Sequence, residues 1–290
     1  MTDEFRLVQV SDPHLSASRA YYHDNWVLTA EWIEREKPDL VAVTGDLVLA
    51  DPDSAADHRF ARERIGQLSV PCRFVPGNHD VGDNIVSGHM PKRVSPERCK
   101  RFVDIYGHDR WVEQAAGWTL VGLNAQILGS DGMAEEAEQW RWLESTLDGS
   151  GDDAVALFLH KPVYLDHPSE ADHEEPFLRQ SCIDSSSRKR LLDLAHSHGV
   201  RLISAGHKHQ SRAFAHDEIY YIWAPATACV NGRPGAPSWG LREVGFLDFR
   251  FRPDGFRHRF TGGDFLFRHE NYVRKMEYGS TSQAPEHPAR

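Results

Sequence analysis

The sequence predicts an α/β fold built on a parallel sheet, and two observations support this prediction. Over the first 80 residues, short apolar runs alternate with segments whose apolar residues recur at helical spacing. Clusters of Asp, Asn and His also follow directly where apolar runs end, as expected of strand ends in an open α/β sheet. With 290 residues and 40% hydrophobic content, the chain can bury a large core, and we expect one main domain.

The first 80 residues predict a βαβαβ unit. The expected strands are residues 5–10, 39–44 and 72–75, and the expected helices between them are residues 25–37 and 54–68. Leu28 and Trp32 lie four apart, on one face of the first helix, and Pro38 ends that helix. The apolar runs are short and nearly continuous, which is typical of strands buried on both faces of a parallel sheet.

The rest of the chain continues this pattern less regularly. We expect strands over residues 118–123, 155–159, 200–204, 219–223 and 244–249, and helices over residues 134–147 and 188–198. The later strands can pair antiparallel. Residues 164–187 and 231–240 are predicted to be loops over the site. The polar segment 276–290 is expected to be a disordered tail, which leaves residues 1–275 as the folded domain.

Composition excludes several classes of partner and location. The net charge of −10, from 33 basic and 43 acidic residues, disfavours nucleic-acid polymers and anionic membranes as partners. The four widely spaced cysteines form no C-x-x-C pair, so we expect reduced thiols and a cytoplasmic protein. No segment resembles a signal peptide or offers 18 consecutive apolar residues, so we expect no membrane span.

Five clusters of residues that favour metals follow the apolar runs. They contain Asp12 with His14, Asp46 after Gly45, Asn78 with His79 and Asp80, His160, and His207 with His209. Carboxylate, amide and imidazole ligands without thiolate suit Mn, Fe or Zn in hydrolysis. Two ions about 3.5–4 Å apart need a ligand that touches both, and a carboxylate can do so with its two oxygens. Asp46 is the candidate for this bridge, and His79 remains free for proton transfer.

The motifs D-x-H, G-D, G-N-H-D, H and G-H-x-H appear in an order that resembles the calcineurin-like metallophosphoesterases, over roughly residues 5–250. The resemblance implies two metal ions of uncertain identity. One would be bound by Asp12, His14, Asp46 and His209, and the other by Asp46, Asn78, His160 and His207. It also implies that His79 binds phosphate or protonates the leaving oxygen, with Asp80 as its orienting partner.

The resemblance further implies a four-layer α/β/β/α sandwich, in which two mixed sheets face one another and helices cover both outer faces. The short Gly45-Asp46-Leu47 motif and the G-N-H-D motif resemble bacterial class III cyclic-nucleotide and glycerophosphodiester phosphodiesterases, whereas the G-D-x-x-D-R-G motif of protein phosphatases is absent. The expected substrate is therefore a small phosphodiester. A solvent molecule between the two ions would lose a proton and attack phosphorus in line.

Several alternatives remain open. A phosphomonoesterase, a phospholipid or nucleotide-pyrophosphate hydrolase, and a metal-binding scaffold without turnover all fit the same motifs. His23, in the loop after the first cluster, is a candidate for substrate contact alongside Asn78 and His79. Asn124-Ala125 stands where relatives often carry Asp-Ser, with an unknown effect on substrate contacts. The acidic residues of the loop 164–187 are expected to be mainly a solvated face. The oligomeric state is open, a homodimer included.

Overall fold

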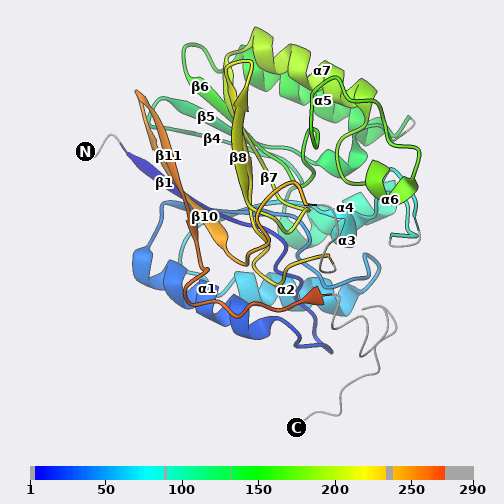
Figure 1. The fold of residues 1–290 in the computed structure, drawn as a ribbon, viewed down its shortest axis with the longest axis vertical. Helices are drawn as coiled ribbons and strands as arrows, with labels where there is room; N and C mark the ends of the chain where they lie inside the picture. Colours follow the sequence, from blue (N-terminus) through cyan, green and yellow to red (C-terminus); the bar gives the residue numbers. More distant parts are fainter. Residues whose placement is uncertain (1–3, 88–89, 131, 233–237, 272–290) are drawn as a thin grey trace.

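The computed structural model describes residues 4–87, 90–130, 132–232 and 238–271, and it shows two facing sheets with helices outside them (Figure 1). The tail expected over residues 276–290 lies outside the described residues. That residues 1–275 form one domain stays a prediction. No helix among the described residues is long and apolar enough to cross a membrane.

The first sheet contains the predicted βαβαβ unit. Its strand order is β11-β10-β1-β2-β3. The strands are β1 (Phe5–Val10), β2 (Leu40–Thr44), β3 (Cys72–Val75), β10 (Phe246–Arg252) and β11 (Gly255–Thr261). β1, β2 and β3 are parallel, as predicted, whereas β10 pairs antiparallel with β1 and with β11. β1 therefore lies in the middle of this sheet although it comes first in the chain.

The second sheet has the order β4-β5-β6-β7-β9-β8. Its strands are β4 (Trp111–Ala115), β5 (Trp118–Gly122), β6 (Ala154–Phe158), β7 (Val200–Ala205), β8 (Arg212–His216) and β9 (Ile219–Trp223). As expected of the later strands, β10 and β9 both make antiparallel pairs, with β1 and β8 respectively, whereas β9 is parallel to β7. The chain reverses after β7 and again at the Asp217-Glu218 turn, so β9 regains the direction of β7.

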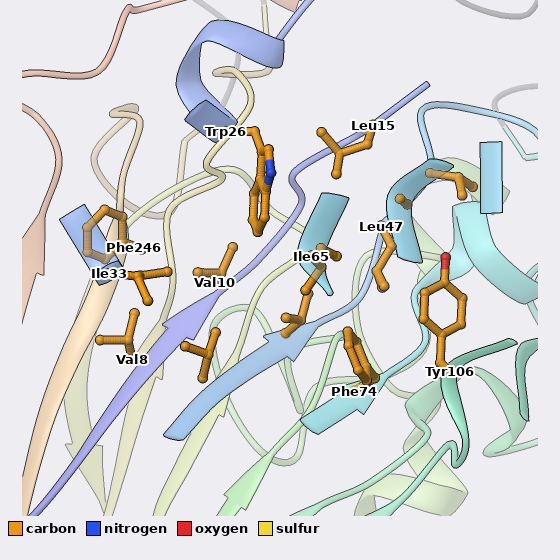
Figure 2. Packing of buried hydrophobic residues seen from close by; sticks show 14 of the residues in the cluster. Val8, Val10, Leu15, Trp26, Ile33, Leu47, Ile65, Phe74, Tyr106 and Phe246 are labelled. Carbon is orange, nitrogen blue, oxygen red and sulfur yellow. The ribbon is translucent and has the colours of Figure 1, made fainter. Parts of the chain in front are cut away.

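Helices cover the outer face of each sheet (Figure 1). They are α1 (His23–Glu36) and α2 (Ala55–Ile65) on the first sheet, and α5 (Ala134–Asp148) and α7 (Ser185–Ser197) on the second. Trp26, Ile33 and Ile65 pack on Val8 and Phe74 beneath α1 and α2 (Figure 2). Two further apolar clusters lie under α5 and α7 and between the sheets. Three apolar interfaces separate four layers, so the predicted α/β/β/α sandwich is confirmed.

Several short elements were not expected. They are α3 (Asn78–Val81), α4 (Pro96–Tyr106), α6 (Pro176–Arg179), the 3₁₀ helix η1 (Ala125–Ile127), and the strands β4, β8 and β11. α4 carries recognisable signals, since Ser95 caps its first turn, Phe102 and Tyr106 lie four apart, and Gly107 ends it in the left-handed region. β4 and β8 are half-exposed edge strands without a continuous apolar run, which explains why the sequence pattern misses them.

Candidate metal centre

The seven predicted metal ligands gather where the strands of both sheets end. Asp12 and His14 follow β1, Asp46 follows β2, His160 follows β6, and His207 and His209 follow β7. Asn78 is the first residue of α3, shortly after β3. The two sheets thus supply ligands from opposite sides of the same space.

The first group of ligand atoms comprises Asp12, His14 and His209, whose potential donors all lie within 4.8 Å of one another. The Nε2 atom of His209 is 3.2 Å from Asp12 Oδ1 and 3.3 Å from His14 Nε2. Asp12 Oδ1 is buried and has no hydrogen-bond partner among the described residues. A buried carboxylate oxygen without a donor is costly unless a cation satisfies it.

The second group converges on His160. Its Nε2 atom is 3.2 Å from Asn78 Oδ1, 3.4 Å from Asp46 Oδ1 and 3.1 Å from His207 Nδ1. Asp46 also approaches the first group, because its Oδ2 atom is 3.9 Å from His14 Nε2. The two oxygens of this one carboxylate therefore face different ligand groups.

Contacts with backbone carbonyls orient the rings of the first group. His209 Nδ1 lies 2.7 Å from Cys229 O, and His14 Nδ1 lies 3.2 Å from Leu49 O and 3.3 Å from Val48 O. Because a carbonyl can only accept, each Nδ1 carries a hydrogen and each ring directs its Nε2 atom inward. The two Nε2 atoms lie 3.3 Å apart, so both can bind one cation when their rings are neutral.

The rings of the second group are oriented in the same way, except that the two ring nitrogens of His207 exchange roles. His160 Nδ1 is 2.9 Å from Thr44 O, so its Nε2 atom faces inward. His207 Nε2 is 3.1 Å from Gln180 O, so in this residue Nδ1 faces inward. Two nitrogens on one tetrahedral ion at 2.0–2.1 Å are roughly 3.3–3.4 Å apart. The observed separations of 3.3 Å in the first group and 3.1 Å in the second are close to this value, so the residues present in each group are suited to holding an ion.

The backbone at the ligands adopts an uncommon conformation. Positive φ angles, between 46° and 68°, occur at Asp12, His14, Asp46, His207 and His209. Non-glycine residues rarely adopt this region, and such strain is characteristic of functional sites. No motif in the sequence indicates that five ligands share a left-handed conformation.

The glycines of the G-D and G-N motifs are required by close packing. A Cβ atom at Gly77 would lie 2.2 Å from Asp46 Oδ1, and one at Gly45 would lie 2.3 Å from His160 Nδ1. Gly45 also has a φ of 87°, which an L side chain rarely adopts. Each glycine therefore makes room for a ligand that belongs to another cluster.

Burial and neighbouring charges act in opposite directions on the carboxylates. Burial alone would raise the pKa of Asp12, but the imidazoles of His209 and His160 outweigh it and keep the pKa below its usual range. The pKa of Asp46 is likewise held low, mainly by His160 and His79. Burial opposes a positive charge on His160, yet Asp46 and Asp12 raise the pKa of this residue to about 9. The two anionic carboxylates thus favour positive charge around them.

His79 lies beside the ligand groups and faces solvent more than the carboxylates do. Its Nε2 atom is 3.9 Å from Asp46 Oδ2, its side chain is 23% exposed, and its buried Nδ1 atom has no partner among the described residues. Its backbone N–H donates to Asp46 Oδ1 at 2.8 Å. The imidazole thus lies at the edge of the ligand groups, where it also forms a possible ligand group with His14 and Asp46.

Asp80 bonds to the backbone, and its role as the orienting partner of His79 stays a prediction. Its carboxylate accepts the backbone N–H groups of Gly77, Leu47 and Val48, at 2.8, 2.9 and 3.1 Å. These bonds join the loop after β2 to the start of α3. Burial, with the charge of Asp46 added to it, raises the pKa of Asp80 to about 7.

His23 packs on a neighbouring helix. Its ring stacks on Phe60 of α2, with centroids 4.8 Å apart and an interplanar angle of 9°. The neighbouring Tyr22 instead lies against the ligands, with its ring centroid 6.5 Å from that of His14. The stacked imidazole packs between α1 and α2, and substrate contact by His23 stays a prediction.

The Asn124-Ala125 departure has a local explanation. Asn124 is fully buried and accepts the backbone N–H of Gln126, which caps η1. Its amide also donates to Asp109 Oδ2 at 3.1 Å. The asparagine therefore stabilises the segment after β5 from within the fold.

The two predicted loops attach to the segment that carries the last two ligands. Gln180, in the loop 164–187, provides the carbonyl for His207, and Ser181 accepts a hydrogen bond from Lys208. Gln210 Oε1 accepts from the backbone N–H groups of residues 239 and 240, at 2.9 and 2.8 Å. A sequence motif could not have revealed the backbone carbonyls that contact the ligand imidazoles, or these contacts between the loops and the segment 207–210.

The chain matches the calcineurin-like phosphoesterases over residues 5–211. The chain belongs to this family. It is therefore a phosphoesterase, a hydrolase of phosphoric esters, and members of this family typically bind two metal ions.

Three relatives illustrate the range of related proteins. A probable glycerophosphodiester phosphodiesterase GpdQ of Arcobacter nitrofigilis is 26% identical and covers 93% of this chain and 94% of its own. The 3′,5′-cyclic adenosine monophosphate phosphodiesterase CpdA of Escherichia coli is 28% identical, covering 86% and 92%. The serine/threonine-protein phosphatase CPPED1 of Danio rerio is 27% identical, covering 79% and 77%.

Proposed function

We propose that this calcineurin-like phosphoesterase is a dinuclear metal-dependent phosphodiesterase acting on a small diester, either a cyclic nucleotide or a glycerophosphodiester. The observation that carries the proposal is the position of Asp46, whose two oxygens face different ligand groups. Asp12, His14 and His209 would complete one site, and Asn78, His160 and His207 the other. Two bound Mn, Fe or Zn ions would supply Lewis acidity toward the phosphoryl oxygens and activate a water molecule.

His79 is proposed to act on the substrate directly. Its imidazole is partly exposed beside Asp46 and has a buried ring nitrogen without a partner. It can contact a phosphoryl oxygen, or donate a proton to the alkoxide that leaves when the P–O bond breaks. Asp80 supports this role indirectly, since its three backbone hydrogen bonds fix the start of α3, which carries His79.

A diester substrate is favoured over the alternatives for two reasons. Two of the three relatives described above are named phosphodiesterases, and both cover more of this chain than the named protein phosphatase does. The net charge of −10 also disfavours polyanions and a second negative charge on the substrate. A phosphomonoesterase is the second candidate, because the relative from Danio rerio is named a phosphatase. The cytoplasmic location and the oligomeric state stay predictions.

A substrate panel tests the proposal. Protein loaded with Mn is assayed with 3′,5′- and 2′,3′-cyclic nucleotides, glycerophosphodiesters, bis-nitrophenyl phosphate and matched monoesters. We expect kcat/KM to be higher for diesters than for the matched monoesters. A monoester preference of tenfold or more, equivalent to about 1.4 kcal/mol of transition-state binding, would favour the phosphatase alternative. Metal binding without any turnover would favour a scaffold.

A further inference from the structure

The side chains buried between the two sheets change from apolar to polar as the strands approach the metal centre. Leu7, Ala42 and Leu202, on β1, β2 and β7, belong to the apolar cluster between the sheets. Two residues further along each strand, and therefore on the same face, stand Gln9, Thr44 and Ser204. All three are fully buried. A single polar layer thus separates the apolar core from the ligands.

Gln9 connects the members of this layer. Its amide nitrogen donates to Thr44 Oγ1 at 2.9 Å, and its Oε1 atom accepts the Ser204 hydroxyl at 2.5 Å. Gln9 and Thr44 belong to the first sheet, and Ser204 belongs to the second. One side chain therefore makes a hydrogen-bonded link across the gap between the sheets.

The link continues to the ligands of both ions. The carbonyl of Thr44 contacts His160 Nδ1 at 2.9 Å and also accepts the hydroxyl of Ser11 at 3.0 Å. Ser11 Oγ is 2.5 Å from Asp12 Oδ2. Ser204 lies two residues before Gly206. The N–H of Gly206 donates to His160 O, and the N–H of His207 donates to Asp12 Oδ2. The contacts made by Thr44 and Ser11 are buried, and the bond from His207 to Asp12 is part-buried.

Each ion would draw its ligands from both sheets. The first group takes Asp12 and His14 from the first sheet and His209 from the second, and the second group takes Asp46 from the first sheet and His160 and His207 from the second. A change in the separation of the sheets at this end would therefore alter both groups at once. Burying the Gln9 amide costs free energy unless its hydrogen bonds are made. The bonds to Thr44 and Ser204 therefore restrict how far apart the two sheets can lie at this end.

We propose that Gln9 is a positioning residue of the metal centre, whose amide sets the separation between the ligands carried by the two sheets. This inference rests on the proposed two-ion site and adds a determinant that contacts neither ion. Gln9 acts through Thr44 and Ser204. Its loss should weaken metal binding and change the distance between the ions more than it changes the stability of the fold.

The test replaces Gln9 with methionine, which has a similar size but neither donor nor amide oxygen. The control is Val8→Ala, since Val8 is the adjacent residue of β1, is fully buried and packs on the opposite face, toward α1. Mn titration measures the affinity of each site, and electron paramagnetic resonance of the Mn-loaded protein reports the coupling between the ions. We expect Gln9→Met to weaken the weaker site at least tenfold and to alter the coupled spectrum. Val8→Ala should lower the Tm and leave both readouts unchanged.

A double-mutant cycle isolates the link itself. Ser204→Ala should also weaken metal binding, and the double variant with Gln9→Met should be no weaker than Gln9→Met alone, because one link is removed in both. Wild-type affinity and spectrum in Gln9→Met, or full additivity in the cycle, would overturn the inference. If Gln9→Met does not fold, Thr44→Val tests the same link, since it removes the hydroxyl and keeps the carbonyl for His160. Fewer than two Mn ions bound by the wild-type protein would instead reject the proposed two-ion site.

Discussion

At the scale of single residues, Asp46 is the most constrained part of the site. Its carboxylate lies between two ligand groups, and its Oδ1 atom also accepts the backbone N–H of His79. Its φ angle of 52° is in the left-handed region, and Gly77 has no space for a Cβ atom beside it. One residue therefore fixes the position of both proposed ions and of the start of α3.

Asp46→Asn should abolish stable binding of two ions. An amide has one oxygen and no charge, so it cannot replace a carboxylate that serves two cations. Metal analysis of the purified variant should find at most one equivalent. Asp248→Asn is the control, since Asp248 is a buried carboxylate of the same sheet that pairs with Arg6 instead. Two equivalents retained by Asp46→Asn would remove the bridging assignment.

His79→Asn should keep both ions and lose turnover. Proton donation is worth roughly 10²–10⁴-fold, and it matters most when the leaving group is a poor one. We therefore expect a larger loss of kcat for alkyl diesters than for nitrophenyl diesters, with unchanged metal content. Equal losses for both leaving groups would reject the general-acid role and favour phosphate binding by His79.

The sequence predicts which residues are the candidate ligands, but it does not predict which atoms hold their side chains in position. Motif order brings seven residues into one hypothesis, and the structure places these residues side by side. The supporting atoms are mostly backbone carbonyls, such as those of Thr44 and Cys229, and any residue type can provide a carbonyl. For the same reason the sequence did not indicate that the hydrogen-bond partners of Asp80 are backbone N–H groups.

At the scale of elements, the loop 164–187 is more ordered internally than its acidic composition suggests. Glu170 accepts the backbone N–H groups of residues 165, 166 and 167, at 2.9, 2.9 and 3.1 Å, and lies 3.6 Å from the buried Arg188. Glu175 caps α6. Glu170 therefore orders the start of the loop, while Glu174 and Glu175 are exposed, as expected of a solvated face.

Glu170→Ala should change substrate choice without changing metal content. The loss of three hydrogen bonds to a charged acceptor should loosen the loop by about 1–3 kcal/mol, while the strand ends that carry the ligands remain in place. The readouts are the ratio of rates among diesters and the metal content. Glu174→Gln is the control, because Glu174 is an exposed residue of the same loop. An unchanged ranking of diesters would show that this loop does not shape the substrate site.

The main elements were predictable because their patterns are local. β1 and β3 have the predicted bounds, and α5 differs by one residue. The missed strands β4, β8 and β11 are half-exposed edge strands, each joined by a tight turn to the strand with which it pairs. β11 alternates aromatic and Arg residues, so it lacks the continuous apolar run by which the buried strands were recognised.

At the scale of the whole molecule, bound ions would join the two sheets. Each ligand group contains residues from both sheets, so metal binding should stabilise the folded protein. An ion present at 100 times its Kd contributes about 2.7 kcal/mol. Treatment with EDTA should therefore lower the Tm, and added Mn or Zn should raise it in proportion to the logarithm of metal concentration.

Asp46→Asn serves as the control for this measurement, because it should bind fewer ions and respond less to EDTA. Scanning calorimetry of both proteins with and without chelator decides the matter. A Tm that is equal in EDTA and in excess metal would mean that metals do not hold the sheets together.

The central place of β1 in its sheet has a consequence for the order in which the chain can fold. One edge of β1 pairs with β2, about 35 residues away, but the other waits for β10, where Phe5 meets Phe251. At roughly 5–20 residues per second, synthesis takes tens of seconds to cover that separation. Throughout that interval the growing chain carries an open, strongly apolar strand edge that could pair with another chain. Strand β10, synthesised more than 200 residues after β1, therefore protects this edge of β1 from aggregation.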